Sequence, residues 1–186
     1  MPTILTHPAV PIALAVGLGN KVVPPRLLAA GIVASILPDL DVIAFRFGIA
    51  YADEFGHRGF SHSLFGAALV GLLGACLYRW YGTGFKRAWV FLFIAMASHG
   101  VLDAFTTGGK GIAFFWPLSD TRFFAPWQVI EVSSLSLSRF FTHRGVEILR
   151  SEFHWVWLPL MSVALLMLAT RHLSDWLGSA GRTRRT

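Results

Sequence analysis

Histidine and aspartate side chains recur at the ends of the apolar segments of this chain, and one pair has helical spacing. His99 and Asp103 are four residues apart, so they share one face of a helix. An imidazole and a carboxylate one turn apart can chelate one metal ion or bridge two. The alternative is a hydrogen-bonded contact at a helix end. Because the flanking residues are apolar, and ionisable groups in such segments are costly and usually functional, we favour metal binding.

Three other positions carry the same residue types. Asp39 and Asp41 are two residues apart, a spacing at which carboxylates on extended or turn backbone can flank one cation. His57 and His62 fit a loop that enters a helix, and His7 precedes the first apolar segment. The simpler interpretations are solvated acids at a helix end and a capping histidine in a surface loop. His7 alone would not indicate a metal site, and it is included only because the other histidines and aspartates are present.

The residue types indicate which metal the site would take. Neutral imidazole and carboxylate ligands without thiolates suit Zn²⁺, with Mn²⁺ and Fe²⁺ as further candidates. Seven ligands exceed one tetrahedral site, so we expect two or more divalent ions that share a bridging carboxylate. The predicted ligands are His7, Asp39, Asp41, His57, His62, His99 and Asp103.

A site of this kind can hydrolyse phosphoesters. Two metal ions roughly 3.5–4 Å apart generate a nucleophile from water and stabilise the attacking and leaving oxygens. We expect catalytic roles for Asp39, Asp41 and Arg58, with the Arg58 guanidinium holding a phosphate oxygen. The alternative for Arg58 is a side chain that reaches the lipid headgroups.

The composition predicts a membrane protein. Of 186 residues, 54% are apolar and only 14% are charged, and the mean hydropathy is +0.58. Soluble proteins carry roughly 25% charged residues, so an ordinary soluble domain and a disordered chain are both disfavoured. The net charge of +6 is interpreted as a topology signal and headgroup contact, not as nucleic-acid binding. The single cysteine, Cys76, excludes an internal disulfide and a cysteine metal site.

Five apolar segments predict the helices: residues 8–19, 27–37, 64–80, 88–102 and 155–169. A transmembrane helix needs about 20 apolar residues. The third segment meets that length alone, the fourth and fifth meet it if their flanks continue the helix, and the first two are too short. We therefore expect an all-α, membrane-embedded helical bundle as a single domain over residues 1–175, followed by a flexible basic tail over residues 176–186.

The basic residues predict the orientation of these segments. If the chain crosses the membrane at each segment, nine of the 16 Lys and Arg residues fall on one side and seven on the other, in a much longer stretch of sequence. The positive-inside rule places the denser side in the cytoplasm and the N-terminus outside. All seven predicted ligands then lie at the outer membrane face, although histidine and aspartate were not used in the count.

The loop after Asp103 has a composition that suits the rim of a site. Residues 106–120 are rich in glycine and hydroxyl side chains, and Asp120 is either a further ligand, an acceptor for a ligand histidine or a simple turn cap. Aromatic residues are dense in this loop and near the segment ends, which is typical of an interfacial belt. Contact with a lipid substrate is the alternative interpretation.

Taken in order, these motifs resemble the YdjM-like family of bacterial inner-membrane proteins over residues 1–170. The motifs are Thr6-His7, Pro38-Asp39-Leu40-Asp41, His57 to Ser63, Ser98 to Asp103, and Thr106 to Gly109 followed by Trp116 to Asp120. The resemblance implies a multi-pass, metal-dependent hydrolase of the bacterial inner membrane, with the site on the non-cytoplasmic side that the charge count indicates. It names no substrate.

The chain is also more distantly similar to the helical zinc-dependent phospholipase C and P1 nuclease group. That resemblance implies zinc ligation by His99 and Asp103, with His62 and Asp39 or Asp41 as further ligands. This chain differs from the group in its apolar helices and in lacking the N-terminal tryptophan ligand.

We expect a hydrolase that acts on phosphoesters, with phospholipid or lipid-linked substrates, in contact with the lipid bilayer and without a nucleic-acid partner. A lipid phosphatase with a phosphohistidine intermediate ranks lower, because the sequence shows no second set of Arg and Lys positioned for it. A small transporter or metal-handling protein would use the same His and Asp cluster to pass ions. A soluble protein with buried apolar helices is the fourth alternative.

Overall fold

The structure, a computed structural model, describes residues 1–133 and 141–183 and confirms the predicted all-α fold. These ranges contain two isolated β-bridges but no strand. The elements are α1 (Ala9–Leu18), α2 (Pro25–Ile36), the 3₁₀ stretch η1 (Leu37–Phe47), η2 (Phe60–His62), α3 (Leu64–Ala75), α4 (Tyr78–Tyr81), α5 (Phe85–Ala104), α7 (His143–Glu152), the π-helical turn η3 (Phe153–Trp157) and α8 (Leu158–Thr183).

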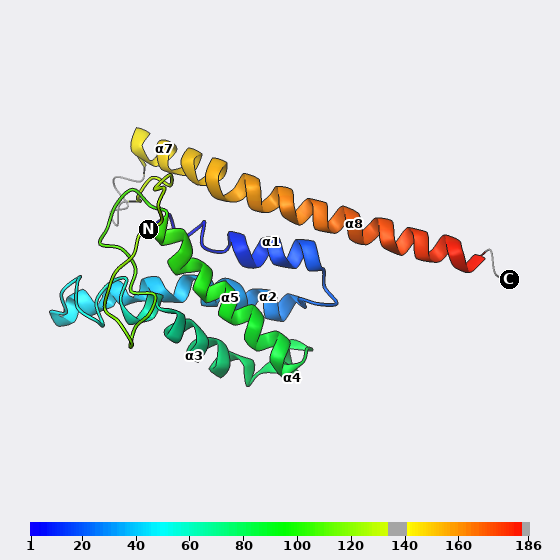
Figure 1. The fold of residues 1–186 in the computed structure, drawn as a ribbon, viewed down its shortest axis with the longest axis horizontal. Helices are drawn as coiled ribbons and strands as arrows, with labels where there is room; N and C mark the ends of the chain where they lie inside the picture. Colours follow the sequence, from blue (N-terminus) through cyan, green and yellow to red (C-terminus); the bar gives the residue numbers. More distant parts are fainter. Residues whose placement is uncertain (134–140, 184–186) are drawn as a thin grey trace.

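The helices run alternately up and down between two ends of the molecule. Figure 1 shows α1, α2, α3 and α5 as a bundle, with α8 lying along α1 and continuing beyond it. The N-terminus, η1 and the non-helical segment after α5 gather at one end, and the α1–α2 and α3–α5 connections gather at the other. We call these the loop end and the basic end.

Small residues let the central helices approach closely. α2 and α3 each pack along α5, and buried alanines such as Ala34, Ala67 and Ala88 occupy the interfaces. A Cβ on Gly31 would lie 2.4 Å from a ring carbon of Phe91, so only glycine allows α2 to sit this close to α5. Close packing of small residues is what holds helices together where lipid removes the hydrophobic drive.

Large apolar side chains cover the outside of the bundle. Val33 on α2, Leu73 on α3 and Leu166 on α8 are more than half exposed. An apolar surface this extensive suits contact with lipid tails and not with water. Three helical stretches are long and apolar enough to cross a membrane: Pro25–Phe47, Phe85–Ala104 and His143–Leu177.

The lengths of the helices agree only in part with the apolar segments predicted from the sequence. α5 extends beyond residues 88–102 at both ends, and the last segment also lengthens in both directions, as expected. The second segment continues as η1, which makes it longer than predicted. The third is shorter than predicted, because α3 ends at Ala75 and the chain turns at Cys76 and Leu77, directly after the weak helix former Gly74.

Two helix starts follow from local chemistry. Pro25 occupies the first turn of α2, where its missing N–H is not needed. Ser63 caps α3, since its Oγ accepts a hydrogen bond from the Gly66 N–H at 2.9 Å. At the other end of the chain, α8 continues to Thr183, whereas the predicted tail began at residue 176. Residues 184–186 of that tail lie outside the described residues.

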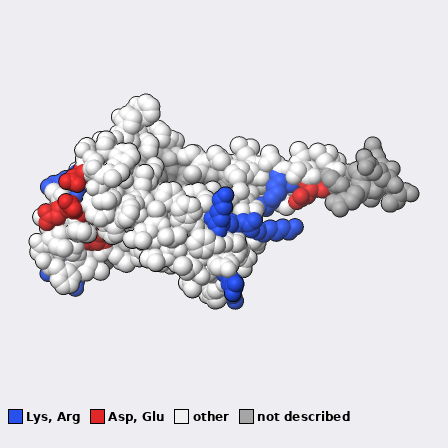
Figure 2. Space-filling view, turned by 60° about the horizontal axis from the view of Figure 1, so that its bottom comes forward, with Lys and Arg blue, Asp and Glu red and all other residues white. Residues whose placement is uncertain are grey.

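The basic end carries an excess of positive charge. Lys21, Arg26, Arg79, Lys86 and Arg87 lie in or beside the two connections there, and the Arg87 guanidinium donates a hydrogen bond to the Lys21 carbonyl at 3.3 Å. Figure 2 shows a group of basic side chains at this end and acidic side chains mostly at the opposite end. The charge asymmetry that was counted along the sequence is therefore also a spatial asymmetry.

Candidate metal centre

The loop end brings all seven predicted ligands into one cluster. His7 lies just before α1, the two aspartates of η1 follow α2, two histidines lie in and before η2, and the last pair closes α5. Two groups of three residues, with no residue in common, each have ligand atoms within 4.8 Å of one another. The first group is His7, His99 and Asp103; the second is Asp39, His57 and His62.

Two carboxylates connect these groups. Asp39 lies 3.6 Å from His7 Nε2 and 3.3 Å from His99 Nε2. Asp103 lies 3.9 Å from His7 Nε2 and 3.5 Å from His62 Nε2. The rings of His7 and His99 stack in parallel with centroids 3.5 Å apart. Each of these two aspartates therefore faces two imidazoles, which is the arrangement expected of a bridging carboxylate.

The hydrogen bonds of the rings decide which nitrogen faces the centre. His99 Nδ1 lies 2.7 Å from the Ser35 carbonyl, which can only accept, so this nitrogen carries the proton. In the neutral ring Nε2 is then a bare acceptor, yet it faces an Asp39 oxygen at 3.3 Å. Two acceptors at this distance repel each other unless a cation lies between them. An oriented imidazole of this kind is typical of a metal ligand.

Asp41 orients two further histidines. One of its oxygens lies 2.6 Å from His57 Nδ1. The other lies 3.2 Å from His62 Nδ1 and accepts hydrogen bonds from the Ser61 hydroxyl and the Arg58 N–H. Because both oxygens are already occupied by protein donors, the geometry of Asp41 is that of an acceptor behind the histidines. It differs in this from Asp39 and Asp103.

Arg58 is buried and engaged by the protein on three sides. Its Nε lies 3.1 Å from Asp103, Nη1 donates to the Gly108 carbonyl at 2.9 Å, and Nη2 donates to the Thr106 hydroxyl at 3.1 Å. Its backbone is left-handed, with φ 67°, an unusual conformation that clusters at functional sites. A Cβ on Gly109, whose φ is 99°, would lie 2.2 Å from Nη1, so this loop closes over the guanidinium only with glycine.

Buried polar atoms without hydrogen bonds are confined to this centre. Within residues 1–133 and 141–177, every such side-chain atom belongs to His7, Asp39, Arg58, His62, His99 or Asp103. Leaving a buried polar group unpaired costs about 1–3 kcal/mol, and more for a charged group. A cation within reach of these lone pairs would satisfy them together, so the donor set fits a divalent metal.

The electrostatics of the centre also favour positive charge. Burial lowers the pKa of His62, but the carboxylates of Asp103 and Asp41 outweigh burial and raise its pKa to about 9. Burial, together with the neighbouring His99, holds the pKa of His7 well below its usual value. The centre has three carboxylates and one guanidinium, so with neutral imidazoles its formal charge is −2. One divalent cation would balance that charge.

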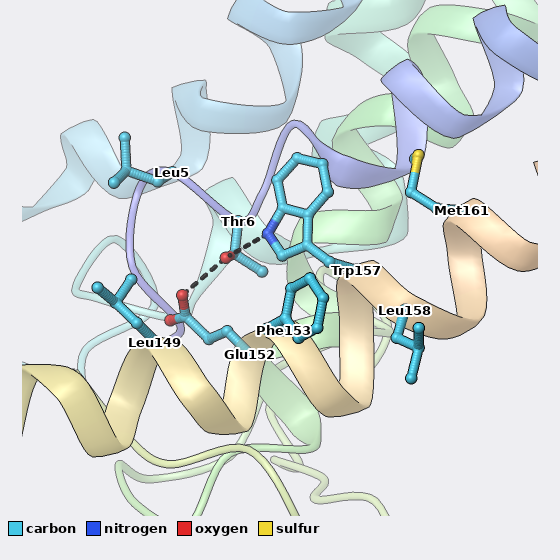
Figure 3. Close-up of a pocket in the computed structure, with 8 residues that line it drawn as sticks. All are labelled: Leu5, Thr6, Leu149, Glu152, Phe153, Trp157, Leu158 and Met161. Atoms are coloured by element: carbon cyan, nitrogen blue, oxygen red, sulfur yellow. Dashed lines mark hydrogen bonds between the residues drawn. The ribbon is translucent and has the colours of Figure 1, made fainter.

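Glu152 is a functional residue that the sequence did not reveal. Figure 3 shows its carboxylate directed at the N-terminal segment, which carries His7. One oxygen accepts from the Thr3 N–H, and the other accepts from the hydroxyls of Thr3 and Thr6 at 2.7 Å each. Trp157 donates its Nε1–H to the Thr6 hydroxyl at 3.1 Å. The only signal in the sequence was an acidic residue at the start of an apolar segment.

The remaining site predictions have mixed outcomes. The loop after α5 does border the centre, through Thr106 and Gly108, while Asp120 is exposed. His143, His154 and His172, which the sequence gave no reason to include, are also exposed. Ser35 and Ser61 were not predicted to belong to the site. The Ser35 carbonyl accepts a hydrogen bond from the His99 ring, and the Ser61 hydroxyl donates one to the Asp41 carboxylate.

Fold and centre together define an integral membrane protein with a helical bundle and a buried His/Asp cluster at one end. The chain belongs to the YdjM inner membrane protein family, whose model matches residues 1–176. It is 54% identical over 162 residues to the inner membrane protein YbcI of Escherichia coli (strain K12), covering 86% of this chain and 92% of that protein. No solved structure matches, and nothing supports the more distant similarity to the phospholipase C and P1 nuclease group.

Proposed function

We propose that this inner-membrane protein is a metal-dependent hydrolase of phosphoesters with a lipidic part. The observation that carries the proposal is the confinement of unpaired buried polar atoms to one His/Asp cluster. Four imidazoles and three carboxylates without a thiolate are a donor set that suits Zn²⁺, Mn²⁺ or Fe²⁺.

Six residues would hold the metal, in the two groups that the geometry defines. His7, His99 and Asp103 form one group and Asp39, His57 and His62 the other, with the two aspartates placed between them. Divalent ions at such a site supply a nucleophile at neutral pH and stabilise the charge that develops in phosphoester displacement. Asp41 positions His57 and His62, and Arg58 holds Asp103 in place.

Charge supports an anionic substrate. A first divalent cation balances the formal charge of −2, and a second would leave the centre positive. An enclosed positive centre selects for an anionic group such as a phosphoester, because electrostatic interactions strengthen away from water. Arg58 donates two hydrogen bonds to protein acceptors and its Nε lies 3.1 Å from Asp103, so its contribution to phosphate binding would come from its charge and its remaining donors.

An apolar groove beside the centre supports a lipidic substrate. It has a volume of about 730 Å³ and lies between α5, α8 and residues 127–130. Ser98 and Leu102 on α5 line it, and each is followed in sequence by a residue of the cluster, His99 and Asp103. The groove is as large as typical ligand pockets and is lined almost entirely by apolar side chains, which suits an acyl or isoprenoid chain.

The charge distribution supports a centre on the non-cytoplasmic side of the membrane. The basic end lies opposite the cluster, and the positive-inside rule would place it in the cytoplasm. Alternating helices would then cross the membrane several times, with the shorter α1 and α3 packed against the long spans.

The proposal is tested by metal content and hydrolysis together. Detergent-purified protein should carry near-stoichiometric divalent metal by plasma mass spectrometry and should release phosphate or a phospho-headgroup from phospholipid micelles. His99→Ala and His62→Ala should lose both properties, whereas His154→Ala, at an exposed histidine, should keep both. Full hydrolysis by metal-free protein would refute the mechanism.

The second candidate function is a small transporter or metal-handling protein. The complete burial of His7, His99 and Asp103 favours it, because an ion reaches an enclosed site more easily than a lipid does. Against it, the core between the cluster and the basic end is apolar, with Leu27, Leu92 and Met96 among its buried residues. Flux of Zn²⁺ or Mn²⁺ into protein-containing liposomes, absent in His99→Ala, would favour transport over hydrolysis.

A further inference from the structure

A second groove, lined by other residues than the metal centre, opens on the outside of the bundle. α2 and α3 both pack on α5 but touch each other little, so a trench of about 360 Å³ remains between them. Small residues keep it open, with Ala29, Ala30 and Ala34 on the α2 wall and Gly74 on the α3 wall. Leu92 of α5 lines it where the two walls diverge.

The positively charged side chain of Arg26 lies at the end of the trench nearest the basic end. Arg26 is exposed, and its guanidinium lies 5.2 Å from the centroid of the Trp80 ring while donating one hydrogen bond to the Trp80 carbonyl at 3.1 Å. This contact holds the side chain over the mouth of the trench and leaves its other N–H donors available. An arginine fork presented in this way matches the geometry of a phosphate.

Asp175 of α8 lines a pocket with Lys21 at this end of the bundle, but no acidic side chain among the described residues lines the trench itself. Residues 1–38 and 55–102, which contain α1, α2, α3, α4 and α5 up to its last turn, include no Asp or Glu. The same stretches place Lys21, Arg79, Lys86 and Arg87 in or beside the two connections at this end. Basic side chains therefore outnumber acidic ones at this end, and anionic lipid headgroups are the anions that a membrane supplies to balance the excess.

The length of the trench matches one leaflet. From Arg26 to Leu37 the chain rises roughly 16 Å along the helix axis, and half of a bilayer core is about 15 Å. A phosphate at Arg26 would therefore leave an acyl chain lying along Ala29, Val33 and Leu37.

We propose that the α2–α3 trench is a binding site for one anionic phospholipid of the leaflet at the basic end, with the phosphate on Arg26 and an acyl chain between α2 and α3. None of the described residues that line this site belongs to the His/Asp cluster, and the site does not depend on the hydrolase proposal.

The test uses native mass spectrometry on the full chain, released from nanodiscs of equal parts phosphatidylglycerol and phosphatidylcholine. We expect one retained phosphatidylglycerol per protein. Arg26→Gln should reduce retention about fivefold, which corresponds to about 1 kcal/mol for one basic side chain near an anionic surface. Ala29→Trp, which fills the trench and leaves the charge unchanged, should reduce retention as well. The matched control Arg46→Gln, an exposed arginine on η1 at the loop end, should retain the lipid.

Three results would overturn the proposal. Equal retention of phosphatidylcholine would show an ordinary annular lipid. Equal loss in Arg46→Gln would show a general effect of net charge. A lipid-free dimer that Ala29→Trp disrupts would show that a second copy of the chain fills the trench. Unchanged metal content in all variants would confirm that the fold and the His/Asp cluster are intact.

Discussion

At the scale of single residues, the centre depends on how each imidazole is held. Ser35 and Asp41 accept from the Nδ1 atoms of three histidines, and in two of them, His99 and His62, the Nε2 atom faces Asp39 or Asp103. Such outer hydrogen bonds fix the tautomer and raise the basicity of the ligand. Substitution of Asp41 should therefore change the affinity for Zn²⁺ less than substitution of Asp39 or Asp103.

Asp41→Asn is expected to weaken Zn²⁺ binding by about 10–100-fold without abolishing it. The amide can accept at one atom only, so it would hold His57 or His62 but not both. Competition with a fluorescent chelator measures the affinity. Asp103→Asn should lose binding altogether, and Asp120→Asn, at an exposed aspartate, should bind like the parent protein. A loss in Asp41→Asn as complete as in Asp103→Asn would make Asp41 a ligand.

The affinity for Zn²⁺ is expected to rise between pH 7 and pH 9. Since the carboxylates raise the pKa of His62 to about 9, this ring is protonated at pH 7 in the absence of a metal, and binding must displace its proton. The dependence should flatten above pH 9, where no proton remains to be displaced. Calorimetry in two buffers of different ionisation enthalpy counts the protons released, and a count of zero at pH 7 would contradict this prediction.

At the scale of elements, the N-terminal segment is held to α7 and η3 by one carboxylate. Glu152 accepts from Thr3 and Thr6, and Thr6 immediately precedes His7. η3 has π-helical geometry, which often occurs at functional sites, and it contributes Trp157 to the same contact. The position of His7, a predicted ligand, therefore depends on an element near the other end of the chain.

Glu152→Ala is expected to destabilise the protein by about 1–3 kcal/mol for each buried donor that loses its acceptor. Because His7 follows these donors directly, Zn²⁺ should also stabilise the variant less than it stabilises the parent protein. Thermal unfolding in detergent, with and without Zn²⁺, measures both effects. Glu147→Gln, at an exposed glutamate on α7, serves as the control. An equal stabilisation by Zn²⁺ in Glu152→Ala and the parent would show that Glu152 acts on the fold alone.

At the scale of the whole molecule, the two ends of the bundle differ in their charged residues. The cluster and most of the acidic residues gather at the loop end, and five basic residues without an acidic neighbour in their connections gather at the basic end. The apolar helices between them set the distance and fix the orientation in the bilayer.

Cysteine labelling of intact cells tests this orientation. In a Cys76→Ser background, Leu118→Cys at the loop end should react with a membrane-impermeant maleimide added outside. Asn20→Cys, in the α1–α2 connection, should react only after permeabilisation. Both parent residues are exposed, so access to the reagent depends on the side of the membrane. The reverse pattern would place the cluster in the cytoplasm.

The sequence by itself determined the helical class, the membrane environment and the seven residues of the cluster. Those properties depend on composition and on residue types at segment ends, which the chain displays directly. It misjudged the lengths of the second and third apolar segments, because α2 continues as the 3₁₀ stretch η1 and α3 ends at Ala75.

Only the tertiary structure separated the roles within the cluster. It directed both oxygens of Asp41 to protein donors, enclosed Arg58, and paired Glu152 with residues 146 and 149 positions away. It also opened the α2–α3 trench. Spacing along a chain gives the face of a helix on which a side chain lies, but hydrogen bonds between distant segments depend on how the helices pack, and helix packing is a property of the whole molecule.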